Sequence, residues 1–446
     1  MLEVKSQFTG NRLLVIDWAS LSYHMIWGMN SAGGKSFLQM KYQGTMITSD
    51  IELMEWRLRM ISCMLEYIRA FNPMHIVLAL EGKNGWRRAF VREWYEKHAR
   101  VYYDSTSLYI LADNRLHSVR KIDDASYEVT AMKMSDMPAI ASKKNVLFGD
   151  MRKEKKDLLW KMTDAKGKPV FPVYKGQRSS QEWPFQTDKA FWMEYKDDFA
   201  RELAPVFRAR AVKIEGAEGD DVMYAAAGQW AKFDDVIVVT RDSDMNQLTF
   251  PNVRLFDHMK CAFADVTSPE GYLSAKILSG DSSDNIHGMA PIDESTGFPK
   301  PKGIGHTTAM RMVNEAVDVH AEAVRGKWTD QYERNRNLID LSCVPADVSS
   351  RIQAALAEPE PPMASPDFLS KYGVSRSDLA AASALAEYGY FCVRPENEVS
   401  REAFRGQELA DKIHDAIEKA SNPEETSDEF GDYLDSPGID PVSDLD

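Results

Sequence analysis

Short apolar runs that end in an acidic residue recur through the first half of this chain. The runs LLVID, HIVLALE and VIVVTRDSD end in Asp17, in Glu81, and in Asp242 with Asp244. Helix-like segments separate these runs, and the alternation predicts a parallel sheet covered by helices. Because ligands of open α/β sheets bind at the carboxyl ends of the strands, acids placed there converge on one site.

The remaining pattern divides the chain further. Strands are expected over 12–17, 75–80, 210–214 and 236–240, and helices over 50–71, 187–204 and 219–232. Ser49 and Glu52 form a capping box before the first of these helices. From residue 268 the chain reads as mainly helical, with a start at Ser268 and a stop at Gly280. The segment 101–170 interrupts the alternation, and the sequence assigns it no fold.

Five further acids complete the acidic pattern. Each acid alone could be a turn residue or a helix-cap residue. Three acids within the four residues of EGDD fit that reading less well, because their mutual repulsion requires a counter-charge. Hard cations such as Mg²⁺ prefer oxygen ligands, and two such ions can clamp a phosphoryl displacement. We therefore predict a metal-dependent phosphodiesterase, with Mn²⁺ suiting the same ligands. Its nine candidate ligands are Asp17, Glu81, Glu218, Asp220, Asp221, Asp242, Asp244, Asp281 and Asp284.

Three other segments carry weaker signals for phosphate binding. Gly303 and Gly305 in KGIGH would let a turn between helices bring its amides close to a phosphate, although GxG is also a common turn. YKGQR, from Tyr174 to Arg178, places two cations beside an aromatic ring. Arg87 and Arg88 likewise place two cations directly after an aromatic residue, Trp86. A solvated basic loop explains the last two segments equally well.

The net charge of −14 does not exclude a nucleic-acid partner, because it is unevenly distributed. Residues 421–446 hold nine acids and no basic residue, and the candidate metal ligands are nine more, so the remaining chain is mildly basic. The tail has little apolar surface to bury, which is typical of disorder. The N-terminus has no signal-peptide pattern, no run is long enough to span a membrane, and the four cysteines form no CxxC pair. These features predict a cytoplasmic protein with no membrane partner.

The acidic motifs, in this order, resemble those of the flap endonuclease/5′→3′ exonuclease family. The resemblance rests on EGDD, on DSD after a strand, on GDSSDNI and on GIGHTTA, and it covers roughly 12–100 and 171–350. VPADVSSRI and the preceding RNLIDL add to it. The closest resemblance is to the phage enzymes, such as the T-even phage RNase H, which implies a phage source and the cytoplasm of the host cell.

The resemblance implies a PIN-like α/β nuclease core with a parallel central sheet, followed by a helix-hairpin-helix-type DNA-binding module. The expected domains are a core over 1–260 with the 101–170 insertion, a DNA-binding region over 261–350, a helical extension over 366–420 and the acidic tail. Lys175 and Arg178 match the family's YKxNR-like motif and would act on the scissile phosphate as catalytic residues. The expected DNA contacts are Arg87, Arg88, Lys302, Gly303, Ile304, Gly305, His306 and Thr307.

The implied activity is hydrolysis of phosphodiesters at 5′ ends and branch points, which would remove RNA primers and flaps during replication. The implied partners are flapped DNA and RNA–DNA hybrids, with a single-stranded-DNA-binding protein or another replication protein as an open option. The implied cofactors are two Mg²⁺ ions, with K⁺ at the hairpin turn also left open.

Three departures from the family pattern keep two rival hypotheses open. Glu81 stands where the family usually has Asp, segment 101–170 has no recognised counterpart, and APIDESTGFPKP is inserted before KGIG. One rival is a structure-specific DNA-binding replication protein with impaired catalysis. The other is a PIN-type ribonuclease that acts on free RNA.

Overall fold

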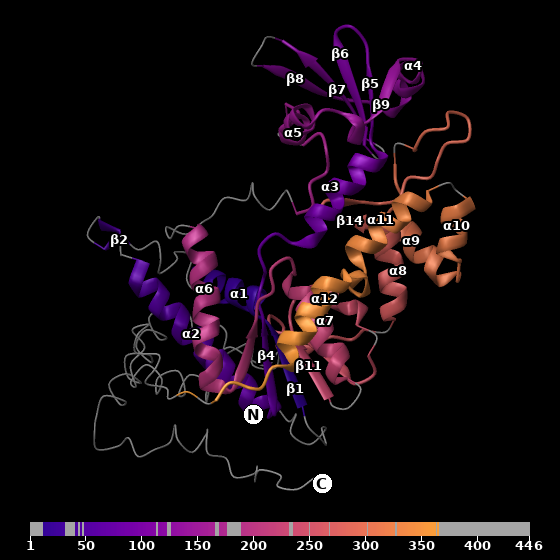
Figure 1. Cartoon of the computed structure of the whole chain (residues 1–446). Coiled ribbons are helices and arrows are strands. Elements are labelled where there is room, and N and C mark those ends of the chain that lie inside the picture. The colour runs from indigo at the N-terminus through magenta and orange to yellow at the C-terminus, as the bar shows by residue number, and fades with distance from the viewer. Residues whose placement is uncertain are drawn as a thin grey trace, which may run out of the picture.

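The computed structural model describes most of the chain, and its helices and strands have well-defined bounds (Figure 1). Described are residues 12–31, 41–42, 45–46, 49–112, 115–122, 126–165, 169–175, 189–231, 235–248, 250–266, 268–300, 302–325, 328–362 and 364. The helices are α1 (Trp18–Ser31), α2 (Ser49–Phe71), α3 (Trp86–His98), α4 (Met137–Ala141), α5 (Lys153–Lys161), α6 (Lys189–Leu203), α7 (Gly219–Trp230), α8 (Pro269–Ser279), α9 (His306–Asn314), α10 (Val319–Arg325), α11 (Thr329–Ile339) and α12 (Ala346–Ala357).

A six-stranded sheet forms the centre of the larger body. Its order is β10-β4-β1-β11-β12-β13, and every neighbouring pair is parallel except the last, β12–β13. The strands are β1 (Arg12–Asp17), β4 (His75–Ala79), β10 (Ala209–Val212), β11 (Asp235–Val239), β12 (Val253–Asp257) and β13 (Ala262–Phe263). The predicted α/β core with a mostly parallel sheet is confirmed, and its four predicted strands form with shifts of one or two residues at their ends.

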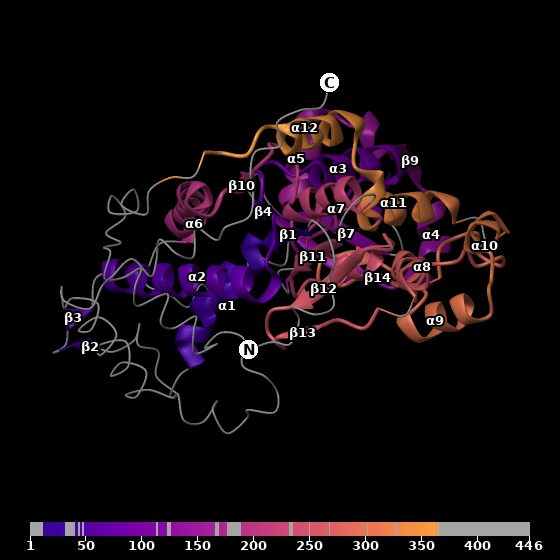
Figure 2. The same cartoon turned by 90° about the horizontal axis from the view of Figure 1, so that it is seen from below.

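Both faces of this sheet are buried, which explains the unbroken apolar runs. In β1, Leu14 and Ile16 pack with α1, α2 and α6, whereas Leu13 and Val15 pack with α7 and α12. Figures 1 and 2 show these two helical layers on opposite sides of β4, β1 and β11. Parallel strands covered by helices on both faces read as continuous apolar runs rather than alternating ones. The first polar side chain of such a run therefore marks the edge of the sheet.

The segment that the sequence could not assign forms a second, antiparallel sheet with the order β8-β7-β6-β5-β9. Its strands are β5 (Arg100–Tyr103), β6 (Ser107–Ala112), β7 (Arg115–Lys121), β8 (Tyr127–Met132) and β9 (Lys144–Leu147). Asp104 begins the β5–β6 turn by accepting hydrogen bonds from the backbone N–H groups of Thr106 and Ser107, both at 2.9 Å. Together with α4 and α5, this sheet projects from the larger body at the end of α3 (Figure 1).

The region after residue 268 is mainly helical, as expected. Ser268 caps α8 by accepting the N–H of Gly271 at 3.3 Å, and Gly280 ends it with a φ of +71°. GDSSDN instead forms a small hairpin from β14 (Gly280–Asp281) and β15 (Ile286–His287). The last described helix, α12, packs back against α7 of the core. Another small hairpin joins β2 (Lys41–Tyr42) and β3 (Thr45–Met46).

Three expectations about chain segments fall beyond what the structure describes. They are the Ser49–Glu52 capping box, whose side chains are not described, the helical extension over 366–420 and the acidic tail over 421–446. Within the described part, no helix is both long and apolar enough to cross a membrane.

Candidate metal centre

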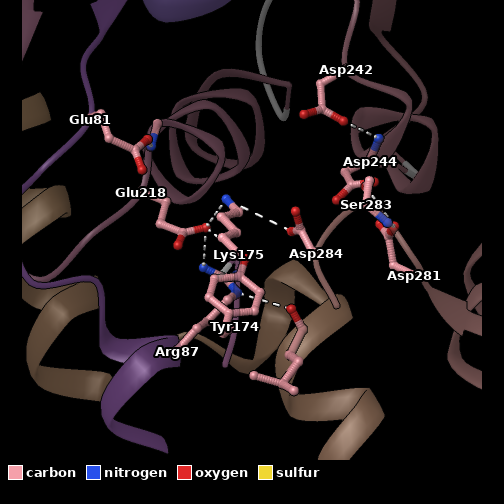
Figure 3. Close-up of polar contacts among 12 residues, drawn as sticks. Glu81, Arg87, Tyr174, Lys175, Glu218, Asp242, Asp244, Asp281, Ser283 and Asp284 are labelled. Carbon is pink, nitrogen blue, oxygen red and sulfur yellow. Dashed lines mark hydrogen bonds and ion pairs between the residues drawn. The ribbon is translucent and has the colours of Figure 1, made fainter. Parts of the chain in front are cut away.

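The predicted acids come together at the carboxyl edge of the central sheet (Figure 3). Asp17 ends β1, Glu81 lies two residues beyond β4, and Asp242 lies three residues beyond β11. The other acids enter from the start of α7 and from the β14–β15 hairpin. They form two groups, one around Glu218 and one around Asp281. Asp242 lies beside Asp244 of the second group, whose N–H it accepts at 2.9 Å, and its charge also acts on Asp17 and Asp220.

Glu218 is the hub of the first group. It is the N-cap of α7, where its side chain and that of Asp221 form a reciprocal capping box. The Oε2 atom of Glu218 also accepts hydrogen bonds from Tyr174 at 2.9 Å and from Lys175 at 2.7 Å. Glu81 lies beside it and accepts the N–H of Gly219 at 3.0 Å. The sequence EGDD therefore serves both as a helix start and as a source of site carboxylates.

Lys175 joins the two groups. Its Nζ atom lies 2.7 Å from Oε2 of Glu218 and 3.8 Å from Oδ2 of Asp284. Burial lowers the pKa of Lys175, but the charges of Glu218, Asp220, Asp284 and Glu81 outweigh it and raise the pKa overall. The backbone of Lys175 has a φ of +56°, in the left-handed region that costs a non-glycine residue about 1–2 kcal/mol. Its N–H donates to the carbonyl of Asp284 at 3.0 Å and helps to hold this conformation.

The second group consists of Asp244, Asp281 and Asp284, whose carboxylate oxygens all lie within 4.8 Å of one another. The Nζ atom of Lys276 forms ion pairs with Asp244 and Asp281, the latter at 2.8 Å. Lys276 was not among the predicted site residues. Its only signal in the sequence was a single cation in the otherwise uncharged helix segment YLSAKILS, directly before GDSSDN.

Burial disfavours the charged form of several site acids. It raises the pKa of Asp17 to about 6, although the N–H of Ser20 and the hydroxyl of Thr240 hydrogen-bond its carboxylate at 2.9 and 2.8 Å. Burial also raises the pKa of Asp220, and the charges of Asp242 and Asp17 add to this effect. Burial raises the pKa of Glu81 as well. Crowded, buried oxygen ligands with this need for positive charge fit hard divalent cations such as Mg²⁺ or Mn²⁺.

The stability of the protein should therefore depend on pH and on divalent metal together. Asp17 has a higher pKa in the folded state than the 3.8 of the unfolded chain, so the folded state binds more protons and loses stability as pH rises through about 6. For Asp17 alone the whole loss, which begins near pH 3.8, is about 3 kcal/mol, and about 1.4 kcal/mol of it falls between pH 5 and pH 8. We expect the melting temperature of the metal-free protein to fall between pH 5 and pH 8, and Mg²⁺ to raise it more at pH 8 than at pH 5. These pH values are roughly one unit or more on either side of that pKa.

Glu218 and Asp281 have lowered pKa values, so their ionised carboxylates stabilise the folded state. This stabilisation is lost only as the pH falls below the ordinary carboxyl pKa of about 4, outside the range of the experiment. The matched control is Asp17→Asn, which should flatten the pH dependence and weaken the Mg²⁺ effect. A metal-free wild-type protein that gains stability from pH 5 to pH 8 would contradict this assignment.

Two of the predicted site residues lie behind the centre rather than in it. Asp221 is 1% exposed, and both its oxygens are engaged: Oδ1 pairs with Arg87 at 2.8 Å, and Oδ2 accepts from Trp86 and from the N–H of Glu218. Arg87 is also 1% exposed, and its Nε donates to the carbonyl of Leu338 at 3.0 Å. The expectation that Arg87 contacts DNA is therefore wrong, because its buried guanidinium forms ion pairs with Asp221 and Glu218 inside the protein. The expectation that Asp221 ligates metal is revised to a supporting position.

The glycines of the KGIGH turn have different roles. A Cβ at Gly303 would lie 2.7 Å from the carbonyl oxygen of Gly288, so packing requires glycine there. A Cβ at Gly305 would meet nothing within 4 Å, and Gly305 is the N-cap of α9. Lys302, His306 and Thr307 are exposed around it, Ile304 is half-buried, and Arg88 is exposed at the start of α3. Arg178 lies outside the described residues.

Comparisons with known proteins find similarity to 5′-3′ exonucleases and DNA polymerases I. The family model for the 5′-3′ exonuclease N-terminal resolvase-like domain matches residues 119–273, from within β7 to within α8. The chain is 28% identical over 181 residues to a DNA polymerase I of Rhizobium leguminosarum, a match that covers 39% of this chain and 16% of that protein. It is 27% identical over 203 residues to a 5′-3′ exonuclease of Bacillus subtilis, covering 43% of this chain and 57% of that one.

The chain thus spans less than two thirds of the length of each of these relatives. Among solved structures it is similar to the T5 D15 protein co-crystallized with metal ions, at 12% identity and a TM-score of 0.40, covering 84% of this chain and 100% of that chain. Over residues 119–273 the chain therefore matches the 5′-3′ exonuclease N-terminal domain, and it is similar to the curated 5′-3′ exonuclease and DNA polymerase I proteins.

Proposed function

We propose that this protein is a divalent-metal-dependent phosphodiesterase that hydrolyses nucleic acid at 5′ ends and branch points, removing primers and flaps during replication. The observation that carries the proposal is the meeting of two carboxylate groups at one sheet edge, joined by the buried ammonium of Lys175. A pair of bound Mg²⁺ ions would supply Lewis-acid stabilisation of the charge that develops on the phosphoryl oxygens. Glu81, Glu218, Asp17 and Asp220 would hold the first ion region, and Asp242, Asp244, Asp281 and Asp284 the second.

The protein's own groups would position the substrate and balance charge. Lys175 lies between the two carboxylate groups, where its fixed positive charge would face a phosphate held there. Asp221 and Arg87 would keep Glu218 in place from behind, because they reach it through its N–H and its carboxylate. The open N-cap of α9 at Gly305 would take a phosphate of the duplex, with Lys302, His306 and Thr307 beside it. A K⁺ ion at this turn and a single-stranded-DNA-binding partner belong to the same proposal.

A substrate panel tests this function directly. A labelled 5′-flap duplex, an RNA–DNA hybrid and a free RNA of the same sequence are incubated with the protein in Mg²⁺, in Mn²⁺ or in EDTA. The proposal expects short 5′ products from the flap and the hybrid in either metal and none in EDTA. Binding of the flap without cleavage in any metal would favour the DNA-binding rival. Preferential cleavage of free RNA would favour the ribonuclease rival.

A further inference from the structure

The inserted segment before the KGIGH turn is an ordered hairpin. The N–H groups of Asp293 and Lys300 donate to the carbonyls of Phe298 and Pro291 at 2.8 and 2.9 Å, and Ile292 pairs with Pro299 in an antiparallel bridge. The N–H of Gly297 donates to the carbonyl of Asp293 at 2.7 Å, and its φ of +69° closes the turn. The ring of Pro299 fixes its own φ angle, which restricts the backbone next to Phe298. The hairpin is therefore a stiff element rather than a loose loop.

The hairpin contacts the second sheet. Phe298 packs against an apolar cluster on one face of that sheet, which we call the sheet cluster. The opposite face of the same sheet packs in a different cluster, with α3 and α5. The inserted segment 290–301 thus contacts the segment 101–170, of which residues 119–170 fall within the matched family model. The sheet cluster consists of Tyr102, Leu116, Met134, Met137 and Ile140.

The base of the hairpin is tied to the KGIGH turn. Ala290 exchanges two hydrogen bonds with the side chain of Gln331 on α11, at 2.8 and 3.2 Å. Met289 accepts the N–H of Ile304 at 2.6 Å and donates its own N–H to Leu278 of α8 at 3.0 Å. The close approach of Gly303 to the carbonyl of Gly288 belongs to the same connection. Lys302 comes four positions after Phe298, a span of at most about 14 Å.

We propose that the hairpin 291–300 is a brace that fixes the KGIGH turn against the second sheet, so that binding of duplex nucleic acid depends on this sheet. A contact that holds one end of a short, stiff segment restricts the conformations of its other end, and this restriction is how coupling passes between neighbouring sites. The mechanical part of the inference stands on the contacts alone. The part concerning duplex binding rests on the proposed function.

Hydrogen exchange of the Ile304 amide reports on the brace in the free protein. Phe298→Ala removes the contact with the sheet cluster and should speed exchange at Ile304 by about 10-fold, through local opening of the Met289–Ile304 bond. Glu294→Gln changes an exposed side chain of the same hairpin and should have no effect. Exchange at Leu80, whose N–H donates to Val212 in the core, should be unchanged in both variants. Phe298→Leu retains an apolar contact and should give an intermediate rate, and it carries the test if the alanine variant does not fold.

Binding supplies the second readout. Measured in EDTA, the Kd for a short blunt duplex should rise about 5-fold in Phe298→Ala and stay unchanged in Glu294→Gln, while binding of a single-stranded oligonucleotide should not change. Unaltered Ile304 exchange in Phe298→Ala and Phe298→Leu would overturn the brace. Faster exchange with unaltered duplex affinity would overturn its part in substrate binding. Because exchange is measured without metal or substrate, it decides the mechanical inference even if the wild-type protein cleaves nothing.

Discussion

Asp220→Asn should lower the kcat for a 5′-flap substrate by at least about 100-fold, the upper range seen when groups around a metal site are removed. Asp220 is half-buried; removal of its carboxylate from water raises its pKa, and the negative charges of Asp242, Asp17 and Glu218 add to this effect. An amide fills the same space but brings no negative charge to a divalent cation. Duplex binding in EDTA should remain within about 2-fold of the wild type, because the exposed KGIGH turn is unchanged.

The control for Asp220→Asn is Asp265→Asn, which removes one acid from an exposed position. It should retain wild-type kcat. The steady-state rate is measured over a range of Mg²⁺ concentrations, so that weaker metal binding is separated from a lower maximal rate. Near-normal turnover of Asp220→Asn at all Mg²⁺ concentrations would remove Asp220 from the metal centre.

Lys175→Met should lower kcat by about 100-fold while raising the Kd for duplex by less than about 3-fold. The methionine side chain replaces the aliphatic length of lysine without its charge. Its effect falls on catalysis because the Lys175 ammonium is buried between Glu218 and Asp284, away from exposed duplex contacts. The measurements are single-turnover cleavage of the flap substrate and duplex binding in EDTA.

Lys302→Ala provides the matched contrast to Lys175→Met. Lys302 is exposed beside the KGIGH turn, so its loss should weaken duplex binding and reduce the salt dependence of the Kd, with the single-turnover rate at saturation unchanged. If Lys175→Met instead showed the Lys302→Ala pattern, Lys175 would be an ordinary phosphate contact. Because both variants remove one positive charge, the contrast isolates position from net charge.

The central sheet and the places of its acids could be predicted from local sequence alone. A buried parallel strand leaves a continuous apolar run, and the first polar residue after it lies at the ligand-binding edge. LLVID and Asp17 show this directly, since every residue of β1 is buried and Asp17 is its last. Ser268 and Gly280 likewise bound α8 as their capping chemistry predicts. Local signals of this kind suffice because they involve residues within a few positions of one another.

Which acids face the metal centre, and which cations pair with them, depended on contacts between distant segments. Asp221 stands next to Asp220, yet a helical turn directs its carboxylate to Arg87, 134 positions away in the sequence, and not to the other acids. Lys276 pairs with Asp244, which lies 32 positions earlier in the sequence, and no local pattern predicts that these two residues meet. The second sheet gave no parallel-strand signal because it is antiparallel, with partly exposed strands and a cluster completed by Phe298 from the distant hairpin 291–300.

The sequence by itself therefore determined the α/β class, the edge where the carboxylates gather and the boundaries of α8, because period, run length and capping are local properties of a chain. Only the tertiary structure decided which acid faces the centre, which cation balances it, and how the insertions contact each other. Those outcomes depend on burial and on the direction of side chains from separate elements. Both arise only when the elements pack, since desolvation makes each buried charge require a partner wherever in the sequence that partner lies.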